Sequence, residues 1–178
     1  MKIPIFVSCP KSYLERQEKF LLEVEGHLES CDLIPMTLGR SEYSIDAPLE
    51  AIRRLMGGSF GLICLAFRRT MIINGRDRPQ SDMQEKEVDR SGTWLSSPYS
   101  QIEPAMAYQI GLPVLIWRES GVAAEGLLDR GAVGLSMPEF DLNIPPDLTD
   151  PKWAQPLQDW IDRVRSAHRH TGKAPKLW

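Results

Sequence analysis

The apolar run FGLICLAF, residues 60–67, constrains the fold of this chain more than any other feature. It lacks the alternation of a half-exposed strand, and it is bounded by Gly57 and Gly58 on one side and by two arginines on the other. An unbroken apolar run of this length is typical of a strand that is buried on both faces. Such strands belong to parallel sheets with helices on both sides, so the run predicts an α/β protein.

Strands and helices alternate along most of the chain. Pro35 favours an edge position for the second strand, because proline lacks the N–H that a central strand needs. Ser12 and Glu15 fit a capping box at the start of the first helix. The alternation predicts a doubly wound, mostly parallel five-stranded sheet with helices on both faces. The expected strands cover residues 3–8, 32–38, 60–67, 113–117 and 132–136, and the expected helices cover 12–29, 45–56, 100–110, 122–130 and 151–168.

Residues 68–92 interrupt this alternation with a polar, charge-rich connection. So long a connection within a domain is usually functional or disordered, and only residues 71–73 are predicted to form an isolated turn or short strand. We see neither an internal repeat nor a domain boundary. We therefore expect one domain over residues 1–178, with its core within 3–136 and a proline-rich segment and final helix over 137–170.

The composition excludes several classes of partner. A net charge of −3, with acidic and basic residues interspersed, gives no large basic surface for nucleic acid or an anionic membrane. The apolar part of MKIPIFVSCP is too short for a signal peptide, and no stretch approaches the ~20 apolar residues of a membrane span. The 3 cysteines form no CxxC pair and the 3 histidines have no ligand spacing beyond one HxH pair. We expect a soluble cytoplasmic protein with reduced thiols, without a metal, nucleic acid or membrane partner.

Ligands of open parallel sheets bind beyond the carboxyl ends of the strands, where the strand order reverses. The expected helix start that carries Glu103 belongs to the same edge. An arginine at this edge could bind a phosphate, or it could be a solvated residue at the end of a strand. A tryptophan could stack on a base or pack in the core. The candidate binding residues at or near this edge are Ser8, Cys9, Gly39, Arg40, Tyr43, Phe67, Arg68, Trp94, Ser100 and Trp117.

Glu103 has two competing interpretations. A helix N-terminus gathers unpaired N–H groups and can hold an anion or a reactive carboxylate. Alternatively, Ser100 and Glu103 fit a capping box, in which the glutamate only bonds its own helix start. Pro104 is then the fourth helical residue and forfeits a hydrogen bond, whereas it takes its favoured first position if Glu103 is the cap. The chain contains no GxGxxG, no GxxxxGK[ST] and no GxSxG motif.

Part of the chain resembles TIR domains and their relatives, the nucleoside 2-deoxyribosyltransferases. The resemblance spans about residues 3–136 and is carried by IFVSCPKSYLERQEKFLLEVEGHLE, APLEAIRRLMGGSFGLICLAF and YSQIEPAMAYQIGLPVLIW. Both families have a flavodoxin-like sheet, and both place a glutamate in a motif S/G-x-x-E-x-x-x-A-x-x-x-G-x-P-V. Here the motif reads Ser100-x-x-Glu103-x-x-x-Ala107-x-x-x-Gly111-x-Pro113-Val114.

The resemblance implies cleavage of an N-glycosidic bond, with Glu103 as the catalytic residue. In deoxyribosyltransferases the glutamate attacks the anomeric carbon, and in catalytic TIR domains it holds the ribose of NAD while nicotinamide leaves. Deoxyribosyltransferases usually carry one aspartate just before the third strand and another beyond it. This chain has Gly58-Ser59 and Phe67-Arg68-Arg69 at those places, and its S-F-G-L-I-C-L pattern is nearer the TIR style. TIR domains usually set a tryptophan about four residues before the glutamate, whereas Trp94 lies nine residues before it.

We therefore expect a TIR-like NAD glycohydrolase, with NAD as substrate and not as cofactor, acting through self-association and having a role in bacterial immunity. Ser8 matches the first-strand loop of the family, and residues 39–43 match its flexible loop. Two alternatives stay open. One is a nucleoside 2-deoxyribosyltransferase-like N-glycosidase, and the other is a non-catalytic module that binds a nucleotide or another TIR domain.

Overall fold

The centre of the molecule is a parallel sheet with the strand order β2-β1-β3-β8-β9. The computed structural model describes residues 2–42, 45, 47–133 and 135–170. This strand order is that of flavodoxin-like folds, with the reversal between β1 and β3. The expected α/β fold with a parallel sheet is confirmed, and its body consists of four strands, since β9 has only two residues. The strands are β1 Ile3–Ser8, β2 Leu33–Met36, β3 Leu62–Ala66, β8 Val114–Arg118 and β9 Leu135–Ser136.

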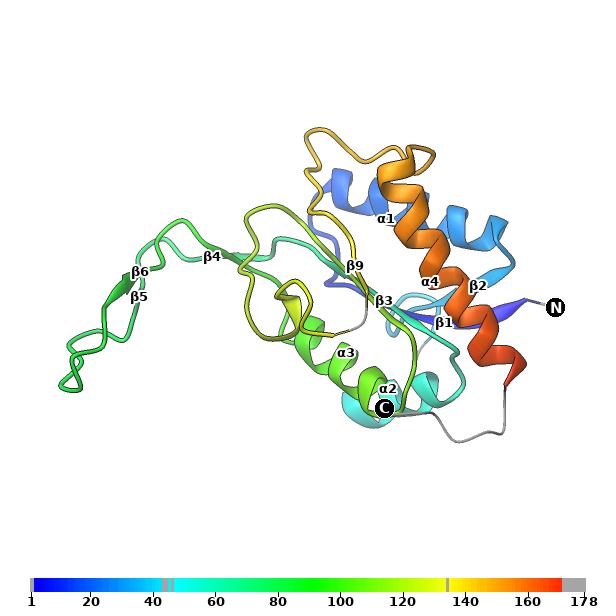
Figure 1. Cartoon of the computed structure of the whole chain (residues 1–178), viewed down its shortest axis with the longest axis horizontal. Coiled ribbons are helices and arrows are strands. Elements are labelled where there is room, and N and C mark those ends of the chain that lie inside the picture. Colours follow the sequence, from blue (N-terminus) through cyan, green and yellow to red (C-terminus); the bar gives the residue numbers. More distant parts are fainter. Residues whose placement is uncertain (1, 43–44, 46, 134, 171–178) are drawn as a thin grey trace.

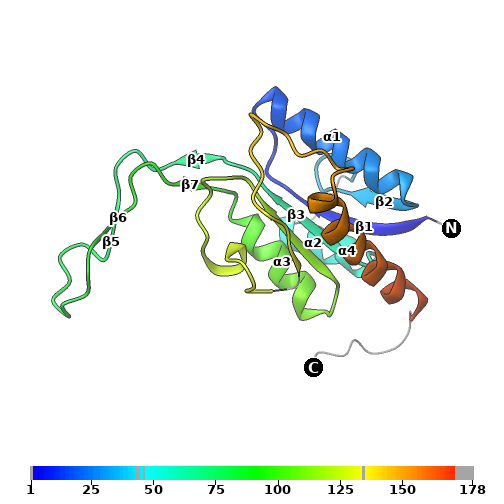
Figure 2. The ribbon, with the colours of Figure 1, turned by 45° about the horizontal axis from the view of Figure 1, so that its top comes forward.

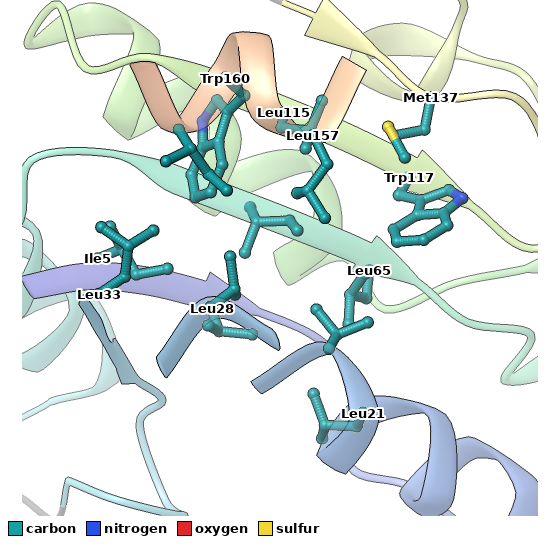
Figure 3. Packing of buried hydrophobic residues seen from close by; sticks show 14 of the residues in the cluster. Ile5, Leu21, Leu28, Leu33, Leu65, Leu115, Trp117, Met137, Leu157 and Trp160 are labelled. Carbon is teal, nitrogen blue, oxygen red and sulfur yellow. The ribbon is translucent and has the colours of Figure 1, made fainter. Parts of the chain in front are cut away.

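Helices cover both faces of this sheet (Figure 1). Helices α1 (Glu15–Ser30) and α4 (Pro151–Arg169) pack on one face, and α2 (Pro48–Gly57) and α3 (Tyr99–Gln109) pack on the other. Because side chains alternate along a strand, odd-numbered residues of β1 and β3 face α1 and α4, while even-numbered residues face α2 and α3. Figure 3 shows the first of these two cores, where leucines of α1 and β3 meet Leu157 and Trp160 of α4. In the described part of the chain, no helix is long and apolar enough to cross a membrane.

Several element boundaries differ from those expected. β2 does lie at the sheet edge, as Pro35 predicts, but it ends at Met36. The capping box at Ser12 and Glu15 is wrong: α1 begins at Glu15 behind Leu14, without a side-chain cap. The start of α2 is set by Pro48, which occupies a first-turn position.

The helix expected over residues 122–130 is also wrong, because this segment holds only the short 3₁₀ turn η1, Gly126–Leu128. Gly126 has a φ of 59°, in the left-handed region that interrupts a helix. The side chain of Gln101 on α3 holds the turn, since its Oε1 accepts from Leu127 N at 2.8 Å and its Nε2 donates to Glu125 O at 2.9 Å.

Residues 69–95 form an antiparallel ribbon, here called the arm, that projects away from the sheet and helices in both views (Figure 1, Figure 2). Near its base, β4 (Thr70–Met71) pairs with β7 (Trp94–Leu95), and further out β5 (Arg76–Asp77) pairs with β6 (Val88–Asp89). The ribbon carries cross-strand ion pairs, so its charges support pairing between strands. The pairs are Arg76–Glu87, Arg78–Glu85 at 3.3 Å and Arg90–Asp77 at 3.3 Å.

Removing the outer arm should leave the stability of the body unchanged. Residues 73–91 contribute no side chain to either buried core, and Ile73 and Met83 are exposed. The ion pair between Arg90 and Glu125, at 2.8 Å, lies near the surface and contributes little to the free energy of unfolding. Replacing residues 73–91 by a short Gly-Ser turn is expected to change the free energy of unfolding in urea by less than about 1 kcal/mol. A loss of several kcal/mol would show that the arm packs on the body in solution.

Candidate active site

Glu103 lies in the second turn of α3, not at the helix start. Helix α3 begins at Tyr99 behind Pro98, so neither Ser100 nor Glu103 is its cap, and both expected capping arrangements are wrong. The chain becomes helical earlier because Ser97 accepts two bonds, from Tyr99 N to its Oγ at 3.2 Å and from Ser100 N to its carbonyl at 2.9 Å. The capping role that competed with a chemical role for Glu103 is therefore absent.

The Glu103 side chain is buried without a charged partner. It is 8% exposed, and no ion pair reaches it from the described residues. Burial disfavours the charged form and raises the pKa of Glu103 from 4.5 to about 7, while Ser8 acts in the opposite direction. The Ser8 hydroxyl is thus close enough to lower this pKa, although its oxygen makes no hydrogen bond of ordinary length and angle in the described structure. A buried, uncompensated carboxyl next to an unsatisfied hydroxyl is costly, and such costs concentrate at functional sites.

The end of β1 brings Ser8 beside Glu103, whereas the next residue, Cys9, packs against the core under α1 and α4. Ser8 is paired in register with Cys64 on the neighbouring strand β3, and α3 packs across both strands. Burial, together with the charges of Glu25 and Glu103, raises the pKa of the Cys9 thiol to about 12. Cys9 therefore stays protonated and is not a nucleophile at neutral pH. Of the two residues expected near Glu103, Ser8 lies on its side of the sheet and Cys9 packs on the other side, and a binding role for either stays a prediction.

The loop after β2 is tied to α1. Arg40 forms ion pairs with Glu18 at 2.6 Å and with Glu25 at 3.3 Å, and its hydrogen bond to Glu18 raises the pKa of Arg40. Gly39 is exposed with a φ of 76°, a backbone conformation that glycine adopts without strain. Tyr43, another expected binding residue, lies outside the described residues. Arg40 thus fixes the loop after β2 against α1, and its guanidinium is already paired with two carboxylates.

Arg68 and Trp94 come together in a separate cluster at the base of the arm. The Arg68 guanidinium lies 5.8 Å from the centre of the Trp94 ring, and its Nε donates to Ser120 O at 2.6 Å. The backbone N–H of Arg68 donates to the carboxylate of Glu119 at 2.8 Å, and Gln17 Nε2 donates to the Arg68 carbonyl at 2.9 Å. These contacts join β3, β8, α1 and the arm. Arg68 is engaged with Glu119 and Ser120, and it is not among the groups that shift the pKa of Glu103.

Phe67 and Trp117 do not line the site, which corrects two sequence predictions. Both side chains are 0% exposed, and both contact the rings of Phe20 and Phe140 in the core under α1 and α4. Figure 3 shows Trp117 in this core, beside Met137. The prediction had the correct edge of the sheet but the wrong face, because odd-numbered positions of β3 and β8 point away from α3.

Cys64 and Ser100 are linked by a contact that the sequence interpretation missed. The Cys64 thiol donates to the carbonyl of Ser100 at 3.7 Å, and both residues are buried. The signal was present in the sequence: Pro104 has no N–H, so the carbonyl four residues before it, that of Ser100, has no helical partner. Sequence alone does not show which side chain fills that place. In the described part of the chain, no three His, Cys, Asp or Glu side chains gather to hold a metal ion.

Comparison with known proteins gives only distant similarities. No protein-family model matches the chain, and no curated protein matches it. A CMP N-glycosidase from Clostridium botulinum has 13% identity and a TM-score of 0.49, over 88% of this chain and 98% of that one. A diflavin flavoprotein from Nostoc sp. has 12% identity and a TM-score of 0.45, over 95% of this chain and 94% of that one. A flavodoxin-like domain from Synechococcus sp. has 10% identity and a TM-score of 0.40, over 94% of this chain and 99% of that one. At this level none of the three assigns an activity to this chain.

Proposed function

We propose that this chain is an N-glycosidase that cleaves the nicotinamide–ribose bond of NAD, with Glu103 as the catalytic residue. The observation that carries the proposal is the buried carboxyl of Glu103, which has a raised pKa and no cation beside it, next to the unsatisfied hydroxyl of Ser8. Both groups lie near the carboxyl edge of a parallel sheet, beside the strand reversal between β1 and β3. This is where flavodoxin-like sheets bind their ligands.

The chemistry requires an anion without a cation of its own. As the bond between the ribose C1′ and the pyridinium nitrogen breaks, its electron pair goes to the nitrogen and nicotinamide leaves as a neutral molecule. The positive charge then lies on the ribose as an oxocarbenium ion, and the Glu103 carboxylate offsets it. Water adds to C1′ and releases a proton to solvent, so NAD and water give nicotinamide, ADP-ribose and a proton. A carboxylate already paired with an arginine would stabilise this state less.

The lack of a cation beside Glu103 favours a substrate that carries its own positive charge at the reacting centre. No charged group is among the causes of the Glu103 pKa shift, and the carboxylates of Glu18 and Glu25 are paired with Arg40. When Glu103 is ionised, its carboxylate therefore has no counter-charge among the described residues. The pyridinium of NAD supplies the positive charge that this site lacks, and a neutral nucleoside does not. This contrast supports NAD over the next candidate.

The next candidate is a nucleoside N-glycosidase of the 2-deoxyribosyltransferase kind. It is favoured by the same freedom of the Glu103 carboxyl, since an oxygen without an ion pair can attack an anomeric carbon. Incubation at high protein concentration, which allows self-association, separates the candidates by mass spectrometry. Nicotinamide with ADP-ribose or its cyclised form from NAD supports the proposal, and base exchange between two deoxynucleosides supports the alternative. Absence of both products would point to a non-catalytic binding module.

A further inference from the structure

Pro104 opens a gap in the hydrogen bonding of α3 directly after Glu103. It lies inside the helix, where it offers no N–H to the Ser100 carbonyl. A proline also disfavours helical backbone angles at the residue before it, and that residue is Glu103. The turn of α3 that contains Glu103 therefore lacks a helical hydrogen bond and needs a contact from outside the helix to hold its conformation.

Cys64 supplies that support from the sheet. It is the middle residue of β3, it is 0% exposed, and its thiol donates to the Ser100 carbonyl that Pro104 leaves open, at 3.7 Å. Burial raises the pKa of Cys64 to about 12, so the thiol keeps its proton at neutral pH. Ser8 lies opposite Cys64 in register, and it also interacts with Glu103. Cys64, Ser100, Ser8 and Glu103 thus form one buried group.

We propose that Cys64 is a positioning residue for Glu103. Through the Ser100 carbonyl it holds the proline-interrupted turn of α3 in the form that presents the Glu103 carboxyl beside Ser8. The inference rests on the proposed function for its consequence on rate, but the geometric role of Cys64 stands apart from the identity of the substrate. It has a specific corollary: Pro104→Ala returns an N–H to position 104, which can bond Ser100, and the Cys64 thiol then loses its role.

The test is a double-mutant cycle on nicotinamide release from NAD. Cys64→Ala is expected to lower kcat about tenfold or more with little change in KM, because a small displacement of a catalytic group is costly. Cys64→Ser keeps a donor and should restore most of the lost kcat. In the Pro104→Ala background, Cys64→Ala should cause less than about a twofold further loss, since coupled residues are not additive. Equal losses in both backgrounds would overturn the positioning role.

A second readout does not depend on activity. The pKa of the Glu103 carboxyl can be measured by 13C NMR titration of glutamate-labelled protein, with Glu103→Gln for assignment. Its neighbours in this measurement are the Ser8 hydroxyl and the thiols of Cys9 and Cys64, whose pKa values of about 12 keep them neutral. In Cys64→Ala the Glu103 pKa should fall toward 4.5, because a loosened turn lets water reach the carboxyl.

The two readouts separate the two proposals. An unchanged Glu103 pKa together with an unchanged kcat would show that Cys64 only fills space, and would overturn the inference. A shifted pKa in a protein that releases no nicotinamide would retain the positioning role and reject the NAD glycohydrolase. A folded control, judged by near-ultraviolet circular dichroism, keeps loss of structure apart from loss of position. Cys64→Val leaves no cavity, adds one methyl group and removes the donor, so it should resemble Cys64→Ala if the bond matters.

Discussion

Glu103→Gln is expected to make the protein more stable than the wild type at pH 8, by up to about 3 kcal/mol. The carboxyl is 8% exposed and its pKa rises from 4.5 in the free state to about 7 in the folded protein. Each pKa unit corresponds to about 1.4 kcal/mol. Ionising Glu103 therefore costs about 3 kcal/mol more in the folded protein than in the unfolded chain. An uncharged amide of the same shape avoids the cost of a buried, unpaired charge.

The gain should depend on pH in a defined direction. Between pH 4.5 and about 7, the folded protein binds more protons at Glu103 than the unfolded chain does, so this residue lowers stability as pH rises through that window. Below pH 4.5 the carboxyl is protonated in both states and the variant should match the wild type. Chemical denaturation at pH 4.5 and pH 8 measures the difference. Glu23→Gln, at an exposed position of α1, is the matched control and should stay within about 0.5 kcal/mol at both values. A Glu103→Gln variant that is less stable than the wild type at pH 8 would show that the carboxylate has a favourable partner.

The rate of NAD cleavage is expected to rise with pH and to level off above about pH 7. The reaction needs the ionised carboxylate, and kcat/KM follows the ionisation of the free protein, in which the pKa of Glu103 is about 7. Below that value kcat/KM should fall by about tenfold per pH unit. The acidic limb of kcat should lie at lower pH, because the bound pyridinium cation lowers the carboxyl pKa.

A pH series of initial rates gives both profiles. With a neutral nucleoside as substrate, the acidic limbs of kcat and of kcat/KM would lie at the same pH. This difference separates the two candidate reactions. A rate that falls as pH rises through 7 would mean that the protonated form of Glu103 is the active one, and this would contradict the proposed role. Cys9 cannot account for either limb, since the pKa of its thiol is about 12.

The sheet was predictable because its signals are local and strong. The run of residues 60–67 has no polar member until the arginines, and the strand it predicts is buried on both faces as β3. Pro35 correctly indicated an edge strand. The arm was not predictable, because its strands have two residues each and carry exposed charged side chains such as Arg76 and Asp77. Side chains of this kind are usual in loops, and only their pairing across the ribbon distinguishes them.

The site was predictable in its centre and less so in its surroundings. Ser8 and Glu103 were selected by a strand end and by a motif, and the fold brings them together, whereas Cys9 packs against the core under α1 and α4. Phe67 and Trp117 were selected by the same strand-end rule, which gives the edge of the sheet but not the face. The start of α3 was missed because Ser97 and Pro98 turn the chain earlier than Ser100, the residue with the sequence signature of a cap. The hydrogen bond from the Cys64 thiol could be found only in the folded structure, since its partner, the Ser100 carbonyl, lies 36 residues away in the sequence.

Release of nicotinamide from NAD at pH 8, compared between the wild type and Glu103→Gln, tests the central claim most directly. The wild type should release nicotinamide in equal amount to ADP-ribose or its cyclised form, whereas kcat of the variant should be lower by about 10²–10³-fold, the usual effect of removing an electrostatic contact to the transition state. The variant should be the more stable of the two proteins, so that its inactivity is not a failure to fold. Equal release by both proteins, or none by either at high concentration, would contradict the assignment of Glu103 as the chemical centre of this fold.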